Sequence, residues 1–295
     1  MDEKDWIFLK TLYEEKNLTR AAERLFISQP ALSYRLKNIE EEFGVNLFFK
    51  TKKGIDFTSE GDYLVKYADD MQRQLQLTKD HMQNMQREVN GTLRLGVSSN
   101  FARYRLPEVL KNFSVRFPSV QFSVKTGWSN DIMNLLGSTK VQVGIVRNDY
   151  QWKGEKVLLA KESLMLISKK ELQFNQIAKM PFIDYSTDPS LRNLINHWWQ
   201  EHFSEPPHIT MEVDKLETCK EMVKYDLGVA VIPEMSLKES DNLFVLPLLD
   251  KKGVPIERTT WLMFDKAFLH LSVVNEFIEF IKAESKSWEP FRTVL

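Results

Sequence analysis

Apolar residues near the start of the chain recur at helical spacing and predict three short helices. A first helix over residues 5–15 would turn Trp6, Leu9 and Leu12 toward one side. Two more fit within Asn17–Phe49, separated by a tight turn. Each has its apolar residues on one face, as expected of helices that pack into a small shared core.

The third helix carries the clearest pattern. It is expected to begin at Ser28, a favoured N-cap residue, with Pro30 in its first turn. Apolar residues then recur at i, i+4, i+7 and i+11, namely Leu32, Leu36, Ile39 and Phe43. At about 100° per residue, the opposite face is small, polar and basic, and consists of Pro30, Ser33, Tyr34 and Lys37. Such a face suits the major groove of DNA, so we predict a helix-turn-helix.

Residues 45–58 predict a β-hairpin. Apolar residues at 47–49 would hold one strand against the helices, and Ile55 and Phe57 would hold the return strand. The turn between them carries three lysines and Gly54. Because this hairpin directly follows a helix-turn-helix, we interpret it as a wing whose lysines contact phosphate. An ordinary exposed hairpin is the alternative.

A long helix is predicted from Thr58 to about Asn90. Its apolar residues alternate in steps of four and three, at Leu64, Ala68, Met71, Leu75, Thr78, Met82, Met85 and Val89. This heptad spacing is typical of a coiled coil. A helix about 45 Å long extends well beyond so small a winged domain, so we predict a homodimer through this helix. Packing against the second half of the same chain is the alternative.

Beyond Asn90, predicted strands and helices alternate in two sets. The first set has strands at 93–98, 120–125 and 141–146, helices up to 116 and at 130–136, and an extended run at 158–167. The second has strands at 182–185, 209–213 and 229–232 and helices at 191–202 and 216–225, before a strand at 258–264 and a helix at 269–282. This order predicts two α/β lobes that bind a ligand between them, at the carboxyl ends of the strands.

Composition adds a local contrast in charge. The 295 residues are 43% hydrophobic and carry a formal net charge of −1, which suits a globular protein of two or three domains. Between Lys16 and Lys53, however, eight Lys or Arg face four Glu. This excess fits phosphate contact by one region, although a solvated surface is the alternative.

Two further observations exclude classes of protein. The single Cys219 rules out a disulfide framework and a cysteine-based zinc site, and suits a small buried residue better than a redox sensor. The charged N-terminus lacks a signal-peptide core, and no apolar run reaches the ~20 residues of a membrane span. We therefore expect a cytoplasmic protein without a membrane partner.

The motif A-A-x-x-L-x-x-S-Q-P-A-L-S at residues 21–33 resembles that of the LysR-type transcriptional regulators. Further matching positions are Leu36, Ile39, Glu40, Gly44, Leu47, Phe48, Thr58 and Gly61. The likeness covers essentially the whole chain. It implies an α/β protein with an N-terminal winged helix-turn-helix (1–58), a long linker helix (59–90) and a two-lobed, periplasmic-binding-protein-like effector domain (91–295). Lobe 1 would span about 91–162 and 265–295, and lobe 2 about 163–264.

The resemblance and the motif together give a set of DNA-contacting residues. These are Thr19, Arg20, Gln29, Pro30, Ser33, Tyr34, Lys37, Lys50, Lys52 and Lys53. Lys50 and Lys53 stand where the family usually has arginine, but lysine also binds phosphate, as a point charge. The family implies a homodimer or homotetramer on double-stranded DNA with inverted half-sites, and RNA polymerase as a further partner.

The effector half further resembles the citrate-responsive regulators of tricarboxylic-acid-cycle genes in Gram-positive bacteria. The similar stretches are Lys125–Leu136, Val143–Gly154, Glu217–Met222 and Pro247–Leu262. This likeness implies control of central-metabolism genes by citrate or another carboxylate, without a cofactor or metal. A LysR-type regulator with a different small anionic effector is the alternative.

Polar residues near predicted strand ends and helix starts form a candidate carboxylate site. They are Ser98, Ser99, Asn100, Ser129, Arg147, Thr218 and Arg258. Hydroxyls and guanidinium groups are suitable donors to carboxylates. Each has an ordinary alternative: the hydroxyls and Asn100 could cap helices, Arg147 could pair with Asp149, and Arg258 with Glu257 or another acid.

Two other classes of protein are disfavoured. An enzyme is disfavoured because the sequence lacks the G-x-S-x-G, G-x-G-x-x-G and G-x-x-x-x-G-K-S/T motifs. His197 and His202 are five residues apart, so they do not share a helix face as zinc ligands at i and i+4 would. A two-lobed solute-binding protein would need export, and the DNA-binding head argues against it.

Overall fold

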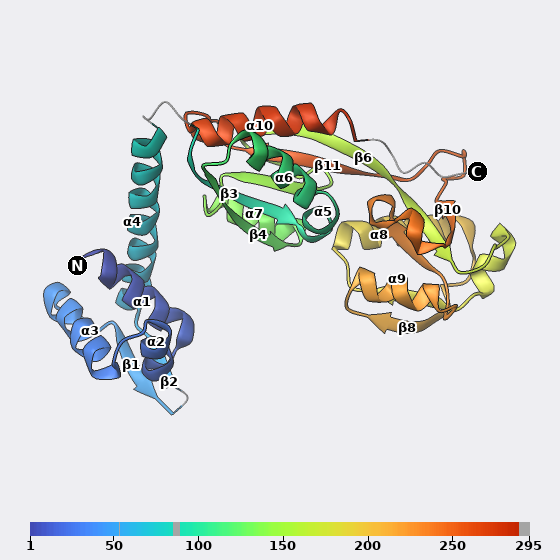
Figure 1. The fold of residues 1–295 in the computed structure, drawn as a ribbon. Coiled ribbons are helices and arrows are strands. Elements are labelled where there is room, and N and C mark those ends of the chain that lie inside the picture. Colours follow the sequence, from blue (N-terminus) through green and yellow to red (C-terminus); the bar gives the residue numbers. More distant parts are fainter. Residues whose placement is uncertain (53, 85–88, 289–295) are drawn as a thin grey trace. The chain divides into compact units, whose positions relative to one another are not determined.

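The computed structural model describes residues 1–52, 54–84 and 89–288 of the chain (Figure 1). The chain divides into two compact units, Met1–Met85 and Gln86–Leu295. Within the described ranges, no helix is both long enough and apolar enough to cross a membrane.

The first unit is a helix-turn-helix followed by a hairpin and a long helix. Its elements are α1 (Glu3–Glu15), α2 (Leu18–Arg24), α3 (Gln29–Phe43), β1 (Phe48–Thr51), β2 (Gly54–Phe57) and α4 (Ser59–Asn84). The predicted start of α3 is confirmed, because the Ser28 hydroxyl accepts a hydrogen bond from the Ala31 N–H at 3.3 Å. The predicted hairpin is confirmed as well, since β1 and β2 pair antiparallel.

The core of this unit follows the predicted stripes closely. Leu9, Leu32, Leu36 and Ile39 are all buried. Phe43 departs from the prediction, because it is 45% exposed at the last turn of α3. The start of α4 lies so close to Leu47 that a Cβ at Gly61 would come within 2.0 Å of the Leu47 carbonyl oxygen. Glycine at position 61 is therefore what allows α4 to pack directly on the hairpin's entry.

The heptad seam of α4 is only partly free for a partner. Leu64 and Ala68 are buried in the core of their own unit, where α4 packs against α1, so most of their side-chain surface is already covered within one chain. Met71 and Leu75 are half-buried and Met82 is exposed. Met85 lies outside the described residues. Helix α4 is described to Asn84, whereas Asn90 directly precedes a strand and is not helical.

The second unit begins with a largely parallel sheet that forms the first lobe. Its elements are β3 (Gly91–Ser98), α5 (Ser99–Tyr104), α6 (Leu106–Arg116), β4 (Val120–Gly127), α7 (Ser129–Gly137) and β5 (Val143–Arg147). Strand β3 pairs in parallel with both β4 and β5. The single helix predicted up to residue 116 is broken at Arg105. The cause is Pro107, which lacks the N–H that a continuous helix would use.

Two long strands connect the lobes (Figure 1). Strand β6 (Glu155–Ser168) pairs antiparallel over its first part with β11 (Glu257–Phe264) and over its last part with β9 (Ala230–Pro233) and β10 (Phe244–Pro247). Strand β11 also pairs with β5. It therefore belongs to the sheet of the first lobe, which corrects the predicted extension of lobe 2 to residue 264. Helix α10 (Ser272–Ser285) closes the first lobe by packing on α6 and β3.

The second lobe contains the remaining strands and helices. They are β7 (Phe182–Tyr185), α8 (Pro189–His202), β8 (Ile209–Val213) and α9 (Leu216–Lys224), with 3-10 turns at Phe174–Lys179, Glu234–Ser236 and Glu239–Asp241. Strands β7 and β8 are parallel, and a bridge from Phe182 to Val229 links them to β9. Cys219 is fully buried in the core of this lobe, and burial raises the pKa of its thiol.

Candidate functional site

Helix α3 presents the predicted polar face to solvent. Tyr34 is 69% exposed, and Gln29, Pro30 and Lys37 are exposed beside it. The Gln29 side-chain amide donates to the Ser33 hydroxyl at 2.9 Å. This bond fixes the orientation of the amide on the exposed face of the helix.

Helix α3 is fixed to α1 by one arginine of its own. The Arg35 guanidinium forms ion pairs with Asp2, at 2.6 Å, and with Asp5. Asp5 is buried and also completes the cap at the start of α1. Arg35 therefore positions the exposed face of α3 from behind and is not part of it.

The other predicted DNA contacts lie on α2 and the hairpin. Thr19 and Arg20 are exposed in the first turns of α2, where Asn17 caps the helix. Arg20 donates to the Glu15 carbonyl oxygen at 2.7 Å. Lys50 and Lys52 are exposed on the hairpin. Lys53 lies outside the described residues.

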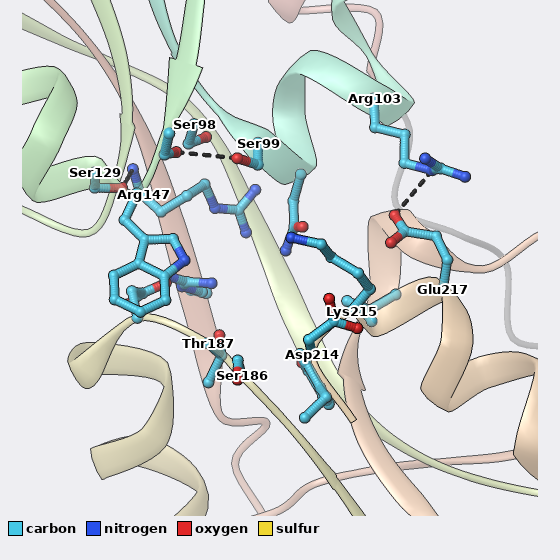
Figure 2. Close-up of a pocket in the computed structure, with 17 residues that line it drawn as sticks. Ser98, Ser99, Arg103, Ser129, Arg147, Ser186, Thr187, Asp214, Lys215 and Glu217 are labelled. Atoms are coloured by element: carbon cyan, nitrogen blue, oxygen red, sulfur yellow. Dashed lines mark hydrogen bonds and ion pairs between the residues drawn. The ribbon is translucent and has the colours of Figure 1, made fainter. Parts of the chain in front are cut away.

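A cavity of about 250 Å³ lies between the two lobes of the second unit. Figure 2 shows Ser98, Ser129 and Arg147 on its first-lobe side, with Ser186, Thr187 and Asp214 opposite. Six of the seven residues predicted from the sequence line it, namely Ser98, Ser99, Asn100, Ser129, Arg147 and Arg258. Thr218 does not, although its neighbours Leu216 and Glu217 do.

Three buried polar atoms at this cavity have no hydrogen-bond partner among the described residues. They are the Ser98 hydroxyl, the Tyr185 hydroxyl and Nε of Arg147. Ser98 stands at the N-cap of α5 but makes no capping hydrogen bond there. Capping therefore does not account for this serine. A buried polar group without a partner is costly, so a polar ligand in this cavity would have three unpaired groups to bind.

Arg147 joins the two lobes from the end of β5. Its backbone N–H donates to the Ser129 hydroxyl at 2.9 Å, and its guanidinium contacts the Met235 sulfur of the second lobe at 3.0 Å. The guanidinium also pairs with Glu162, whereas Asp149 pairs with Lys156, so the proposed pairing with Asp149 is wrong. Burial, followed by the charge of Arg258, lowers the pKa of Arg147.

Arg258 pairs with an acid, as one of the alternatives predicted. That acid is Asp188, the N-cap residue of α8, which also accepts from the Leu191 N–H at 3.1 Å. Burial alone would raise the pKa of Asp188, but the charge of Arg258 and hydrogen bonds from Ser190, Arg258 and Leu191 hold that pKa below its usual value.

The rim of the cavity carries further charged groups. Glu217 of α9 pairs with Arg103 at 2.8 Å and accepts from the Tyr104 hydroxyl at 3.1 Å, which ties α5 to the second lobe. Asp214 and Lys215 are exposed on the second-lobe side. Trp128, which was not among the predicted site residues, lines the cavity and is 50% exposed.

The second-lobe wall was largely missed from the sequence. Tyr185 is the last residue of strand β7, and Ser186, Thr187 and Asp188 follow it. The signal was present, because a run of hydroxyl residues after a buried strand is the same pattern that singled out Ser98 and Ser99. No group of His, Cys, Asp and Glu within the described residues is arranged to hold a metal ion.

Comparison with known proteins assigns both units. Residues 4–62 match the family model described as "Bacterial regulatory helix-turn-helix protein, lysR family", and residues 86–286 match "LysR substrate binding domain". The HTH-type transcriptional regulator YraN of Bacillus subtilis is 53% identical over 96% of this chain and 98% of its own length. YkuM of the same organism is 36% identical over 96% of this chain and 97% of its own length.

Solved structures of low sequence identity share the fold. Full-length CbnR in complex with its target DNA has a TM-score of 0.69 at 17% identity, over 97% of this chain and 100% of that one. A full-length variant of OxyR from Pseudomonas aeruginosa has a TM-score of 0.62 at 18% identity, over 98% of this chain and 99% of that one. Families and relatives are transcriptional regulators, not enzymes. The chain belongs to the LysR family and is a DNA-binding transcriptional regulator with an effector-binding domain.

Proposed function

We propose that the interlobe cavity binds a small carboxylate effector and that citrate is the first candidate. The observation that carries this proposal is the convergence of three buried, unpartnered polar atoms, from Ser98, Arg147 and Tyr185, on one cavity. Ser98 and Arg147 belong to the first lobe and Tyr185 to the second. One bound ligand would therefore form hydrogen bonds with both lobes at once. A different small anion is the alternative effector. If the effector is citrate, the genes under control would be those of central metabolism.

The effector acts by changing the balance between arrangements of the lobes. Strands β6 and β11 connect the lobes, and contacts such as Glu217 with Arg103 cross between them. A ligand shifts such a balance only by binding one arrangement better than another. Hydrogen bonds to Ser98 and Tyr185 provide that difference, because they need both walls close to the ligand.

The exposed face of α3 reads DNA in the major groove, and the hairpin lysines contact phosphate. Support comes from the exposure of Gln29, Tyr34 and Lys37 and from the position of Lys50 and Lys52 on the hairpin that follows. Polar side chains at the start of a recognition helix contact base edges. Two copies of this unit would recognise inverted half-sites, with access of RNA polymerase as the regulated step.

A homodimer through α4 and the end of α3 provides the two copies, and pairs of dimers would give a tetramer. An apolar groove in the first unit is lined by Phe43, Tyr63 and Tyr67, among others, and Tyr63 is 75% exposed. Large exposed apolar patches are typical of interaction sites. Met71, Leu75 and Met82 extend this surface along the predicted seam.

Sedimentation equilibrium of the full chain at micromolar concentration measures this association. We expect a dimer or larger species for the wild type and a predominantly monomeric Tyr63→Ser/Tyr67→Ser variant, because both side chains are exposed and apolar surface is lost. Exposed substitutions leave the fold intact, which circular dichroism checks. A monomeric wild type, or a variant that associates as strongly, would contradict the dimer surface.

Titration calorimetry of citrate into the full chain tests the effector site. We expect saturable heat with one site per chain. The Ser98→Ala and Tyr185→Phe variants should each bind at least tenfold more weakly, because a hydrogen bond to a charged group contributes about 1.5–3 kcal/mol. Thr218→Ala, which alters a residue outside the cavity wall, is the control. Absence of saturable heat from the folded wild type would sink the citrate proposal.

A further inference from the structure

Both buried arginines at the cavity already have carboxylate partners from the protein. The side chains of Arg147 and Arg258 are 2% and 1% exposed. Arg147 pairs with Glu162 and Arg258 pairs with Asp188. An anionic effector therefore does not meet two free guanidinium groups. It meets two neutralised pairs, and its own charge is added to them.

The two resident carboxylates differ in where they lie. Asp188 lines the interlobe cavity itself. Glu162 instead lines a second cavity, of about 290 Å³, which Arg147 lines as well. Of these two acids, only Asp188 therefore shares the space of a ligand in the first cavity.

Asp188 is held firmly in this position. One carboxylate oxygen accepts from the Ser190 hydroxyl at 2.5 Å and from the Leu191 N–H at 3.1 Å, and the other pairs with Arg258. Asn148, at the end of β5, accepts from Nε of Arg258 at 3.4 Å and also contacts Ser190. This cluster connects the first-lobe sheet to the start of α8.

We propose that Asp188 is the resident counter-ion of the effector site and sets the negative charge that an effector can carry. This inference rests on the proposed carboxylate effector. A ligand carboxylate that approaches Arg258 either displaces Asp188 or lies beside it. Like charges at such short range repel strongly when water is largely excluded. The repulsion grows with each charge on the ligand, so Asp188 weakens the binding of a trianion such as citrate more than that of a singly charged acid such as acetate.

The Asp188→Asn variant tests the charge limit. Asparagine has the same shape and is as good an N-cap as aspartate, but it removes the negative charge. In calorimetry on the full chain, we expect Asp188→Asn to bind citrate at least tenfold more tightly than the wild type does, and to change acetate affinity less than threefold. Asp184→Asn is the matched control, because Asp184 pairs with Arg192 outside the cavity wall. The proposal would be overturned if Asp188→Asn changed the affinities for citrate and acetate by the same factor, or if it weakened citrate binding.

A second variant tests the counter-ion without any effector. Asp188→Ala leaves Arg258 buried without its carboxylate and opens space beside it. We expect a lower Tm than in the wild type. We also expect formate to restore at least half of the loss in Tm, whereas chloride at the same concentration does not. Asp184→Ala should show no such rescue. Failure of formate to rescue Asp188→Ala would overturn the proposal.

The two arms separate this inference from the proposed function. Formate could restore the Tm of Asp188→Ala while the wild type binds no carboxylate. That result would support Asp188 as the counter-ion and reject the carboxylate effector. Citrate binding by the wild type, with neither rescue nor altered charge preference in the variants, would keep the effector site and reject the role of Asp188.

Discussion

Replacing Arg147 with alanine is expected to lower the free energy of unfolding of the effector-binding unit by about 3–5 kcal/mol, the usual cost of breaking a buried ion pair. The substitution leaves Glu162, whose side chain is only 11% exposed, without its cationic partner. It also removes the contact with Met235 that reaches the second lobe. Urea denaturation of the full chain, followed by fluorescence of the effector-binding unit, measures the change.

A double variant separates the charge from the space that the side chain fills. Arg147→Met/Glu162→Gln keeps similar volumes and removes both charges, so it should recover most of the lost stability. A single Arg147→Ala variant within about 1 kcal/mol of the wild type would contradict the buried pair. As a member of the carboxylate site predicted from the sequence, Arg147 is also expected to contribute to the ligand response. The structure adds that stability must be measured first.

Replacing Gln29 and Tyr34 together with alanine is expected to weaken operator binding by about 2–4 kcal/mol, since each good base contact contributes about 1–3 kcal/mol. Both side chains are exposed on α3 and make no core contacts that hold the unit together. Fluorescence anisotropy with a duplex from the protein's own upstream region, at one fixed salt concentration, measures the affinity.

The control for this prediction is Lys52→Ala on the hairpin. Loss of a phosphate contact weakens binding to specific and non-specific duplexes alike, whereas loss of base contacts affects the specific duplex most. Circular dichroism shows whether each variant is folded. An equal loss on both duplexes for Gln29→Ala/Tyr34→Ala would contradict readout by α3.

The DNA-binding unit was predictable because its rules are local. A Ser28 cap, Pro30 and an apolar stripe define α3 within one helix, and the observed start agrees with the expected one. The end of the stripe was not predictable, because whether Phe43 is buried depends on how far the core extends. The same applies to Leu64 and Ala68, whose heptad spacing did not reveal that α1 covers them.

The candidate site was predictable on one wall only. Ser98, Ser129 and Arg147 follow successive parallel strands, so topology places them at one edge of the sheet. Which second-lobe loop faces that edge depends on the packing of β6 and β11, which no local pattern gives. The partner of Arg258 illustrates this, because the sequence offered Glu257 or another acid as an alternative, and the observed partner, Asp188, lies 70 residues away.

If a ligand between the lobes controls DNA binding, operator affinity must respond to that ligand through the interlobe cavity. Operator affinity of the full chain is measured by anisotropy across a citrate titration, for the wild type and for Ser98→Ala/Tyr185→Phe. We expect citrate to change the wild-type affinity or the anisotropy of the bound complex, with a midpoint that matches the calorimetric Kd, and to leave the double variant unresponsive at that concentration. A wild type that binds citrate without any change on DNA, or a double variant that responds at the same midpoint, would contradict the account.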